Sequence, residues 1–314
     1  MALQGSEFNK WTRAVAISLT LSVAVLGFIQ ATTSIGNRST IIFTALLTSV
    51  TGILLAVIFK TLDSNPTTVT MSLLGFPRTG KTVYLTALFD QLQQANESGI
   101  QFTPHGSETV EEVTKNLNSL SRGVWIPPTK PGVVFFYRAT ALTGAGLFKR
   151  KYKLEIADYA GESIGELNPF DEKWLHKTDY FKYVIQSDAV ILAIDTQVLS
   201  ERARDEIDEI QNAFVAAFQI LAEHKGAVDG KKLKTPVALL FMKADLIREK
   251  DLEKEMMGEV SRLINVCRGR CRYFRHFFVS SVGDLGLDGQ PPKHLRPIGV
   301  VEPIVWLLQH SNRI

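Results

Sequence analysis

Hydrophobic residues follow two different patterns along this 314-residue chain. Residues 14–30 and 40–59 are two uncharged, mainly apolar runs separated by the polar residues 31–39. Each run is close to the roughly 20 residues that a helix needs to cross a hydrocarbon core. The pattern predicts a transmembrane helical hairpin over residues 11–60. A cleaved signal peptide is disfavoured by the second run, and a buried hairpin of a soluble domain stays as an alternative.

From residue 61 to residue 314 the pattern is that of a folded domain. Short apolar runs alternate with segments of helical period, which predicts a three-layer α/β domain with a mainly parallel sheet. Strands are expected at residues 68–75, 132–142, 151–158, 189–195, 235–242 and 277–279, and helices at residues 82–94, 109–123, 163–188, 200–224, 251–267 and 299–310.

Charge separates the same two regions. Lys10, Arg13 and Lys60 flank one side of the predicted hairpin and Arg38 the other, so the positive-inside rule places both ends of the hairpin and the domain in the cytosol. The remainder of the chain holds 31 basic and 31 acidic residues, and this balance does not indicate a nucleic-acid partner. Ser, Thr and Gly within both runs permit close helix packing, and with it a homo-oligomer.

The N-terminus and the two cysteines add little to the functional argument. Residues 5–8 read Gly-Ser-Glu-Phe, which two adjacent cloning sites encode, so residues 1–10 are either tag-derived or a short native tail. Cys267 and Cys271 are too few for a disulfide framework, and no further metal ligands follow at a suitable spacing. Arginines surround both thiols and form either a solvated, ion-paired face or a contact with anionic lipid.

A phosphate-binding motif follows the first strand of the domain. Residues 75–82 read GFPRTGKT and match G-x-x-x-x-G-K-[ST] in full, between a buried strand and a helix. Backbone N–H groups of such a loop point at phosphates, the lysine reaches the β and γ phosphates, and the threonine offers its hydroxyl to Mg²⁺. The predicted nucleotide-binding residues here are Gly75, Arg78, Thr79, Gly80, Lys81, Thr82 and Val83.

Two later motifs fit a nucleotide site. Asp158 ends an alternating strand and begins D-x-x-G (residues 158–161), so it is a predicted ligand of the metal shell. Residues 242–245 read MKAD after an apolar strand, which is either a base-binding turn or an ordinary strand-to-helix turn with Asp245 near an N-cap. Serines at 280 and 281 follow the next strand.

These motifs resemble the Ras-like G domain of the translation-factor-related class of P-loop GTPases. The similarity covers about residues 67–309 and is greatest to bacterial double-GTPase-type domains; the signal recognition particle receptor β subunit is similar in architecture only. The resemblance implies that Gly161 senses the γ-phosphate, that Lys243 covers the base and that Asp245 reads guanine. It also implies base contacts from the backbone of Ser280 and Ser281.

The chain departs from the family pattern at two positions. Met242 replaces the family's Asn or Thr, which removes a polar contact near the base. Glu162 replaces the Gln that orients water, so turnover is expected to be slow. Within the long switch I insertion, residues 98–150, Thr129 is the candidate for closing over Mg²⁺. Arg78, Arg122 and Arg138 are candidate arginine fingers, with solvated or ion-paired side chains as the alternative.

The sequence thus favours a membrane-anchored, Mg²⁺-dependent GTPase with catalytic residues Lys81, Glu162 and Thr129, and metal ligands Thr82, Asp158 and Thr129. GTP or GDP and Mg²⁺ are its expected ligands. A bacterial inner membrane is its expected location, and a protein effector at the switches its expected partner. A scaffold that hardly hydrolyses nucleotide and an ATPase of the same fold are the alternatives.

Overall fold

The computed structural model describes residues 66–94, 100–129, 134–143, 150–159, 179–201, 204–227, 230–246, 250–283, 285 and 289–311. Within these ranges no helix combines the length and the apolar character needed to cross a membrane. The predicted hairpin at residues 11–60 lies outside the described residues and stays a prediction, as do the domain boundaries drawn around it. Residues 67–142 and 152–314 form one compact unit.

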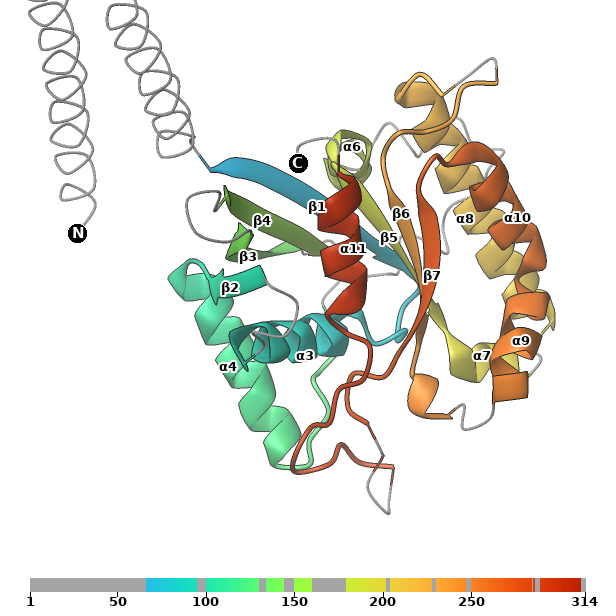
Figure 1. Cartoon of the computed structure of the whole chain (residues 1–314). Coiled ribbons are helices and arrows are strands. Elements are labelled where there is room, and N and C mark those ends of the chain that lie inside the picture. Colours follow the sequence, from blue (N-terminus) through green and yellow to red (C-terminus); the bar gives the residue numbers. More distant parts are fainter. Residues whose placement is uncertain are drawn as a thin grey trace, which may run out of the picture. The chain divides into compact units, whose positions relative to one another are not determined.

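Strands and helices alternate through this unit (Figure 1). The strands are β1 (Thr67–Gly75), β2 (Ile100–Pro104), β3 (Val134–Thr143), β4 (Arg150–Tyr159), β5 (Ala189–Asp195), β6 (Val237–Met242) and β7 (Phe274–Val279). The helices are α3 (Lys81–Gln94), α4 (Ser107–Ser121), α6 (Asp179–Gln186), α7 (Thr196–Ser200), α8 (Arg204–His224), α9 (Lys250–Glu259), α10 (Ser261–Arg270) and α11 (Glu302–His310), with a 3₁₀ turn η2 at Ala244–Leu246.

The strands form one sheet in the order β2-β3-β4-β1-β5-β6-β7. Strand β1 pairs in parallel with β4 and β5, β5 pairs in parallel with β6, and β6 with β7. The three-layer α/β fold with a mainly parallel sheet is therefore confirmed. In a sheet of this kind the carboxyl ends of neighbouring strands meet at one edge, where ligands bind.

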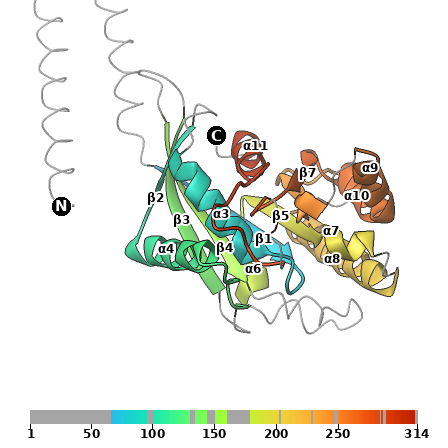
Figure 2. The same cartoon turned by 90° about the horizontal axis from the view of Figure 1, so that it is seen from below.

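Apolar residues cover both faces of the sheet, because the parallel strands are buried between helix layers. In β1, β5 and β6 successive side chains enter opposite cores: Ile191 packs in one core cluster, and Leu192 in the other. Helices α3 and α11 contribute to the first cluster, and α8 and α10 to the second (Figure 2). All seven residues of β5 are buried, as the continuous apolar run AVILAID predicts.

Three details differ from the sequence prediction. Strand β2 was not predicted, although buried Ile100 and Phe102 alternate with exposed Gln101 and Thr103. It lies at the edge of the sheet and ends at a proline, which edge positions tolerate. The helix expected at residues 251–267 is two helices, α9 and α10, separated at Val260, whose fully buried side chain joins the second core cluster. Helix α7 was not predicted; it lies just before α8, which is the helix expected at residues 200–224.

Other expectations are confirmed or stay open. Helix α4 lies where the switch I insertion was expected to be helical, and β3 and β4 are neighbours in the sheet. Of the long switch II helix expected at residues 163–188, only α6 lies within the described residues.

Candidate functional site

The predicted site residues gather at the carboxyl edge of the sheet. The register pairs Leu73 with Asp158 and Asp195 with Met242, so the ends of β1, β4, β5 and β6 lie side by side. The loop after β1 and the turn after β6 therefore face a common space.

The loop of residues 75–80 has the backbone of an anion-binding nest. Arg78 and Gly80 have positive φ angles of 63° and 87°, and alternation of hand along a turn points successive N–H groups to one side. A side chain at Gly75 would meet the carbonyl oxygen of Ala193 at 3.0 Å and Oγ1 of Thr79 at 3.1 Å. Glycine at 75 is thus required for close approach, and Gly80 for its backbone angle.

Lys81 closes this loop from within. Its Nζ donates hydrogen bonds of 2.8 Å to the carbonyl oxygens of Gly75 and of Phe76, and the residue is 7% exposed. Thr79, 3% exposed, donates from its hydroxyl to the same Phe76 carbonyl at 2.9 Å. The ammonium charge is therefore held at the mouth of the nest, where a phosphate oxygen would meet it.

Three oxygen-bearing side chains meet at the start of α3. The Thr82 hydroxyl donates to Oδ2 of Asp158 at 2.8 Å and lies 3.1 Å from the Thr129 hydroxyl. Because a threonine has one O–H, Thr129 then donates to Thr82. The geometry thus brings together all three predicted metal ligands, which come from α3, from β4 and from the segment after α4.

The environment of Asp158 fits a cation. Its residue is 2% exposed, and its Oδ1 is buried without a hydrogen-bond partner, which is unfavourable unless something else satisfies it. Burial raises the pKa of the Asp158 carboxyl, while the Lys81 charge and the Thr82 hydrogen bond oppose that rise. A divalent cation would relieve the burial penalty by favouring the ionised form.

The available oxygen ligands fit a Mg²⁺ ion that is shared with a bound phosphate, rather than a metal ion that protein side chains hold alone. Hydroxyl and carboxylate oxygens are ligands that Mg²⁺ accepts, and it is commonly held by one or two carboxylates together with substrate phosphates. Among the described residues no group of three or more His, Cys, Asp or Glu is arranged to hold a metal. Thr82, Asp158 and Thr129 would therefore hold Mg²⁺ together with a bound polyphosphate, whose charge the metal would neutralise.

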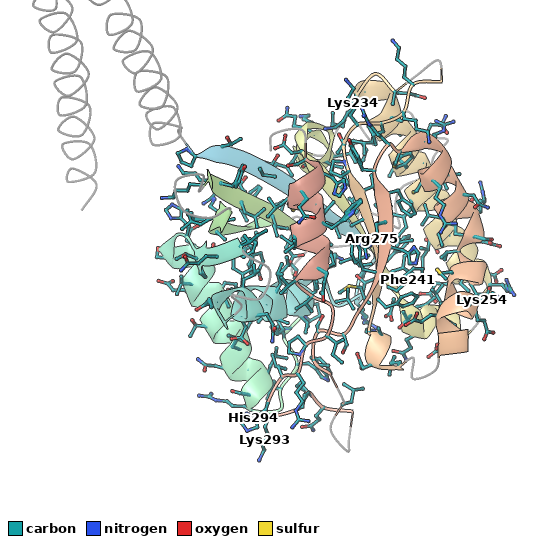
Figure 3. All side chains as sticks on the ribbon, in the orientation of Figure 1. Lys234, Phe241, Lys254, Arg275, Lys293 and His294 are labelled. Atoms are coloured by element: carbon teal, nitrogen blue, oxygen red, sulfur yellow. The ribbon has the colours of Figure 1, made fainter. Side chains whose placement is uncertain are left out.

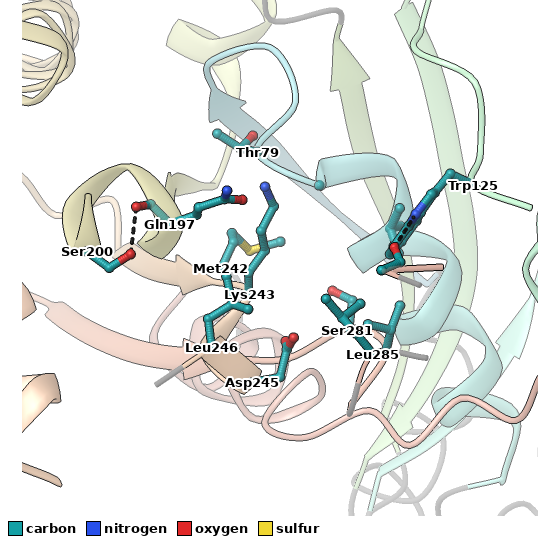
Figure 4. A pocket seen from close by; sticks show the side chains of 14 residues that line it. Thr79, Trp125, Gln197, Ser200, Met242, Lys243, Asp245, Leu246, Ser281 and Leu285 are labelled. Atoms are coloured by element: carbon teal, nitrogen blue, oxygen red, sulfur yellow. Dashed lines mark hydrogen bonds between the residues drawn. The ribbon is translucent and has the colours of Figure 1, made fainter. Parts of the chain in front are cut away.

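Beside the phosphate loop lies a cavity of about 480 Å³ (Figure 4). Lys243 and Asp245 lie on one side of it, and Trp125 lies on the other. Its lining comes from several distant segments: Thr79, Gly80, Val83, Trp125, Gln197, Ser200, Met242, Lys243, Asp245, Leu246, Ser281, Val282, Leu285 and Gly289. A space of this size next to a phosphate nest suits the base and sugar of a nucleotide.

Asp245 is fixed by the loop that follows β7. The Ser280 hydroxyl donates to its Oδ1 at 2.6 Å, and Ser280 in turn accepts a hydrogen bond from the Gly283 N–H at 3.0 Å. Ser280 is buried and Asp245 only partly buried, so the carboxylate is held in place but accessible. Ser281 lines the cavity itself.

Lys243 has a strained backbone that aims its side chain along the cavity. Its φ is 59°, and it and Arg78 are the two non-glycine residues with positive φ in the described ranges. Such conformations cost about 1–3 kcal/mol and cluster at functional sites. The Lys243 ammonium pairs with Oδ2 of Asp195. The Thr196 hydroxyl lies 2.7 Å from the Met242 carbonyl oxygen and 2.9 Å from that of Lys243.

Sequence patterns did not indicate Trp125 and Gln197, which line this cavity, or Asp195, which lies beside it and pairs with Lys243. Asp195 caps α7 by accepting from the Gln197 N–H at 3.0 Å while it pairs with Lys243; an acid that ends an apolar strand was the available signal. Gln197, two residues further along the chain, lines the cavity. Trp125 is 41% exposed and donates from its indole to the Gly289 carbonyl at 3.1 Å, and no local pattern indicated this contact across 164 residues.

Some predicted residues do not join this arrangement. Gly161 and Glu162 lie outside the described residues, so their roles stay predictions. Arg138 forms an ion pair of 2.8 Å with Glu155 on the sheet, which fits the structural alternative rather than an arginine finger. Arg122 is exposed at the end of α4, and Arg78 is exposed on the loop.

Comparisons with known proteins do not assign a function to this chain, so the function is argued from its residues. No family model and no curated protein matches the chain. Among solved structures, the small GTPase Arl6 (BBS3) of Trypanosoma brucei, with bound nucleotide analogue GppNp, is 16% identical with a TM-score of 0.39, over 79% of this chain and 99% of that one. A Plasmodium falciparum protein assigned as nucleolar GTP-binding protein 1 is 13% identical with a TM-score of 0.37, over 80% and 90%. Scores this low carry no argument about this chain.

Proposed function

We propose that this protein is a Mg²⁺-dependent GTP-binding switch with slow GTPase activity, tethered to a membrane by its N-terminal hairpin. The observation that carries the proposal is the cluster of Lys81, Thr82, Thr129 and Asp158 at the phosphate nest. A buried ammonium, two hydroxyls and a buried carboxylate with an unpaired oxygen supply what a metal-bound triphosphate needs.

The preference for guanine rests on Asp245. Guanine presents the N1–H and N2–H donors side by side, and a carboxylate can accept both, whereas adenine lacks this pair. Asp245 faces the cavity and is oriented by Ser280. The Lys243 stem would cover one face of the base, and Trp125 lies across the cavity from it (Figure 4).

The switch character rests on Thr129. This residue belongs to the segment between α4 and β3, yet its hydroxyl meets Thr82 beside the predicted metal position. A γ-phosphate and Mg²⁺ would hold such a segment, and hydrolysis would release it. In this proposal the segment around Thr129 and the residues after Asp158 form the surface that a protein effector recognises.

The proposal is tested with the full chain purified in detergent. Phosphate release from GTP and from ATP is measured with and without Mg²⁺, beside Lys81→Ala and the matched surface variant Lys115→Ala. We expect slow, Mg²⁺-dependent GTP turnover that Lys81→Ala abolishes and Lys115→Ala leaves unchanged, because Lys115 is exposed on α4.

Two other outcomes would replace parts of the proposal. Tight GTP binding without turnover would make the protein a nucleotide-loaded scaffold and direct attention to Glu162. Faster turnover of ATP than of GTP would overturn the base assignment at Asp245. Membrane tethering is tested separately by flotation with neutral lipid vesicles after detergent is removed. A chain that does not float with the vesicles contradicts the hairpin.

A further inference from the structure

A dense group of positive charges lies at the amino edge of the sheet, opposite the nucleotide cavity. Residues 230–236 and 268–273 together hold six Lys or Arg and no Asp or Glu. We call these six the amino-edge basic patch: Lys231, Lys232, Lys234, Arg268, Arg270 and Arg272. All six are exposed, and Lys234 lies at the end of the domain remote from Lys293 and His294 (Figure 3).

A short parallel bridge holds the two halves of the patch together. Leu233 pairs with Cys271, the Leu233 N–H donates to the Arg270 carbonyl, and the Arg272 N–H donates to the Leu233 carbonyl, each at 2.8 Å. Leu233 and Cys271 are 1% and 3% exposed. Because side chains alternate along extended backbone, Lys232, Lys234 and Arg272 face outward beside these two. Arg268 and Arg270 lie in the last turn of α10.

This arrangement concentrates charge without internal compensation. In the described part of the chain none of the six side chains forms an ion pair; the Arg272 guanidinium lies over the Tyr273 ring at 5.4 Å. Some other exposed basic residues of the described domain have acidic partners, as Lys115 has Glu112 and Arg204 has Glu259. Like charges gathered without counter-charges indicate an anionic partner.

The position of the patch favours a membrane surface as that partner. Parallel pairing of β1, β5, β6 and β7 places the start of β1, at Thr67, at the same edge as the patch. Lys153, exposed on β4, pairs in register with Thr68 beside it. The apolar run ends at Phe59, and the seven-residue step from Lys60 to Thr67 spans at most about 25 Å when extended.

We propose that the amino-edge basic patch binds the anionic headgroups of the bilayer in which the hairpin is anchored. This inference rests on the membrane tether of the proposed function. Contact at this edge leaves the opposite, carboxyl edge, with the nucleotide cavity and the Thr129 segment, accessible from the cytosol. The tether sets where the domain is, and the patch sets which edge faces the lipid.

The test uses the full chain reconstituted into vesicles. Cys267 and Cys271 are buried, and burial raises the pKa of both thiols, that of Cys267 to about 12. A dye donor on Lys231→Cys is therefore selective, and the acceptor is a headgroup-labelled lipid. The vesicles are phosphatidylcholine alone or phosphatidylcholine mixed with phosphatidylglycerol. The charge variant is Lys232→Glu with Lys234→Glu, and its matched control is Lys254→Glu with Lys293→Glu, both exposed and away from the patch (Figure 3).

We expect roughly twofold higher energy transfer in the anionic vesicles, lost at about 1 M salt, where the Debye length is about 3 Å. The patch variant should lose the increase and the control pair should keep it.

Equal transfer in both vesicle types from a chain that floats with neutral vesicles overturns the patch and leaves the tether intact. A chain that floats only with anionic vesicles supports the patch and contradicts the hairpin. Dye anisotropy that responds to added single-stranded RNA but not to anionic lipid would assign the patch to nucleic acid and overturn the proposal.

Discussion

At the phosphate end of the site, one contiguous loop supplies most of the groups, whereas the base end collects side chains from segments far apart in the chain. Lys81 and Thr79 are almost fully buried, and both bond carbonyls of their own loop. Asp245 and Trp125 are accessible and are held by contacts across 35 and 164 residues. The phosphate end is thus preorganised by local sequence, and the base end depends on the packing of loops. Substitutions should therefore act strongly and uniformly at the first end, and selectively at the second.

The largest effect is expected at Lys81. Lys81→Ala removes the charge at the nest, takes the Lys81 donor away from the Gly75 carbonyl and leaves the Phe76 carbonyl with the Thr79 hydroxyl alone. Hydrogen bonds to charged groups contribute about 1.5–3 kcal/mol each, so triphosphate affinity should fall on the order of 1000-fold for every base. Isothermal titration measures it, and a thermal melt checks folding. Unchanged affinity would show that the loop is not a phosphate site.

Asp158→Asn tests the metal position next to that loop. The amide can still accept from Thr82, but it removes the charge that would face a cation. Changes of this kind around metal ions lower affinity about 10–100-fold, so the Mg²⁺ concentration for half-maximal GTP binding should rise by that factor. Affinity measured in EDTA should hardly change. A variant with the same Mg²⁺ requirement as the parent would remove Asp158 from the metal shell.

The pH dependence of Mg²⁺ binding tests the same carboxyl without a substitution. Burial raises its pKa above the ordinary value of 3.8. In the metal-free protein this burial penalises the ionised carboxyl, so the contribution of Asp158 to stability is fully present below the ordinary pKa of 3.8 and is lost as pH rises through the raised pKa. Mg²⁺ needs the ionised form, so its affinity should fall about tenfold per unit below that pKa. In Asp158→Asn this acid limb should be absent.

Asp245→Asn should change selectivity rather than overall affinity. The amide keeps an oxygen for Ser280 but replaces a base acceptor by a donor, so preference should move from guanine towards xanthine nucleotides by about tenfold. Competition of GTP and XTP for a fluorescent nucleotide measures the ratio. Ser280→Ala is the companion variant, because it should weaken GTP binding without reversing the preference. Unaltered selectivity in Asp245→Asn would place base recognition elsewhere.

Trp125→Phe should have the smallest effect. It keeps an aromatic ring in the cavity and removes the hydrogen bond to Gly289, whose net contribution is about 0.5–1.5 kcal/mol. GTP affinity should fall a few-fold, while the Mg²⁺ requirement stays the same. Stopped-flow fluorescence should also lose the part of the nucleotide-dependent signal that comes from Trp125. Loss of Mg²⁺ dependence in this variant would contradict the comparison, because it would show that the base end of the site controls metal binding at the phosphate end.

The same contrast explains what could be predicted from sequence. Period and motif were sufficient for β1, the phosphate loop and α3, because strand, turn and helix there are specified by adjacent residues. They also located Asp158, near the end of the alternating strand β4, and Asp245, in the turn after the apolar strand β6. Trp125 could not be assigned, since its role comes from the approach of the segment after α4 to Gly289. Asp195 was missed although it ends an apolar strand, since its pairing partner Lys243 comes from the turn after β6. The division of residues 251–267 into two helices was missed because Val260 continues the helical apolar pattern.

Equilibrium competition between GTP and ATP for the full chain in Mg²⁺, with Lys81→Ala beside it, decides whether the cavity is a guanine nucleotide site. GTP should displace a fluorescent guanine nucleotide at a concentration at least about tenfold lower than ATP does, and Lys81→Ala should bind neither. Equal or better displacement by ATP would contradict the guanine site at Asp245. Undiminished binding by Lys81→Ala would contradict the nucleotide site itself.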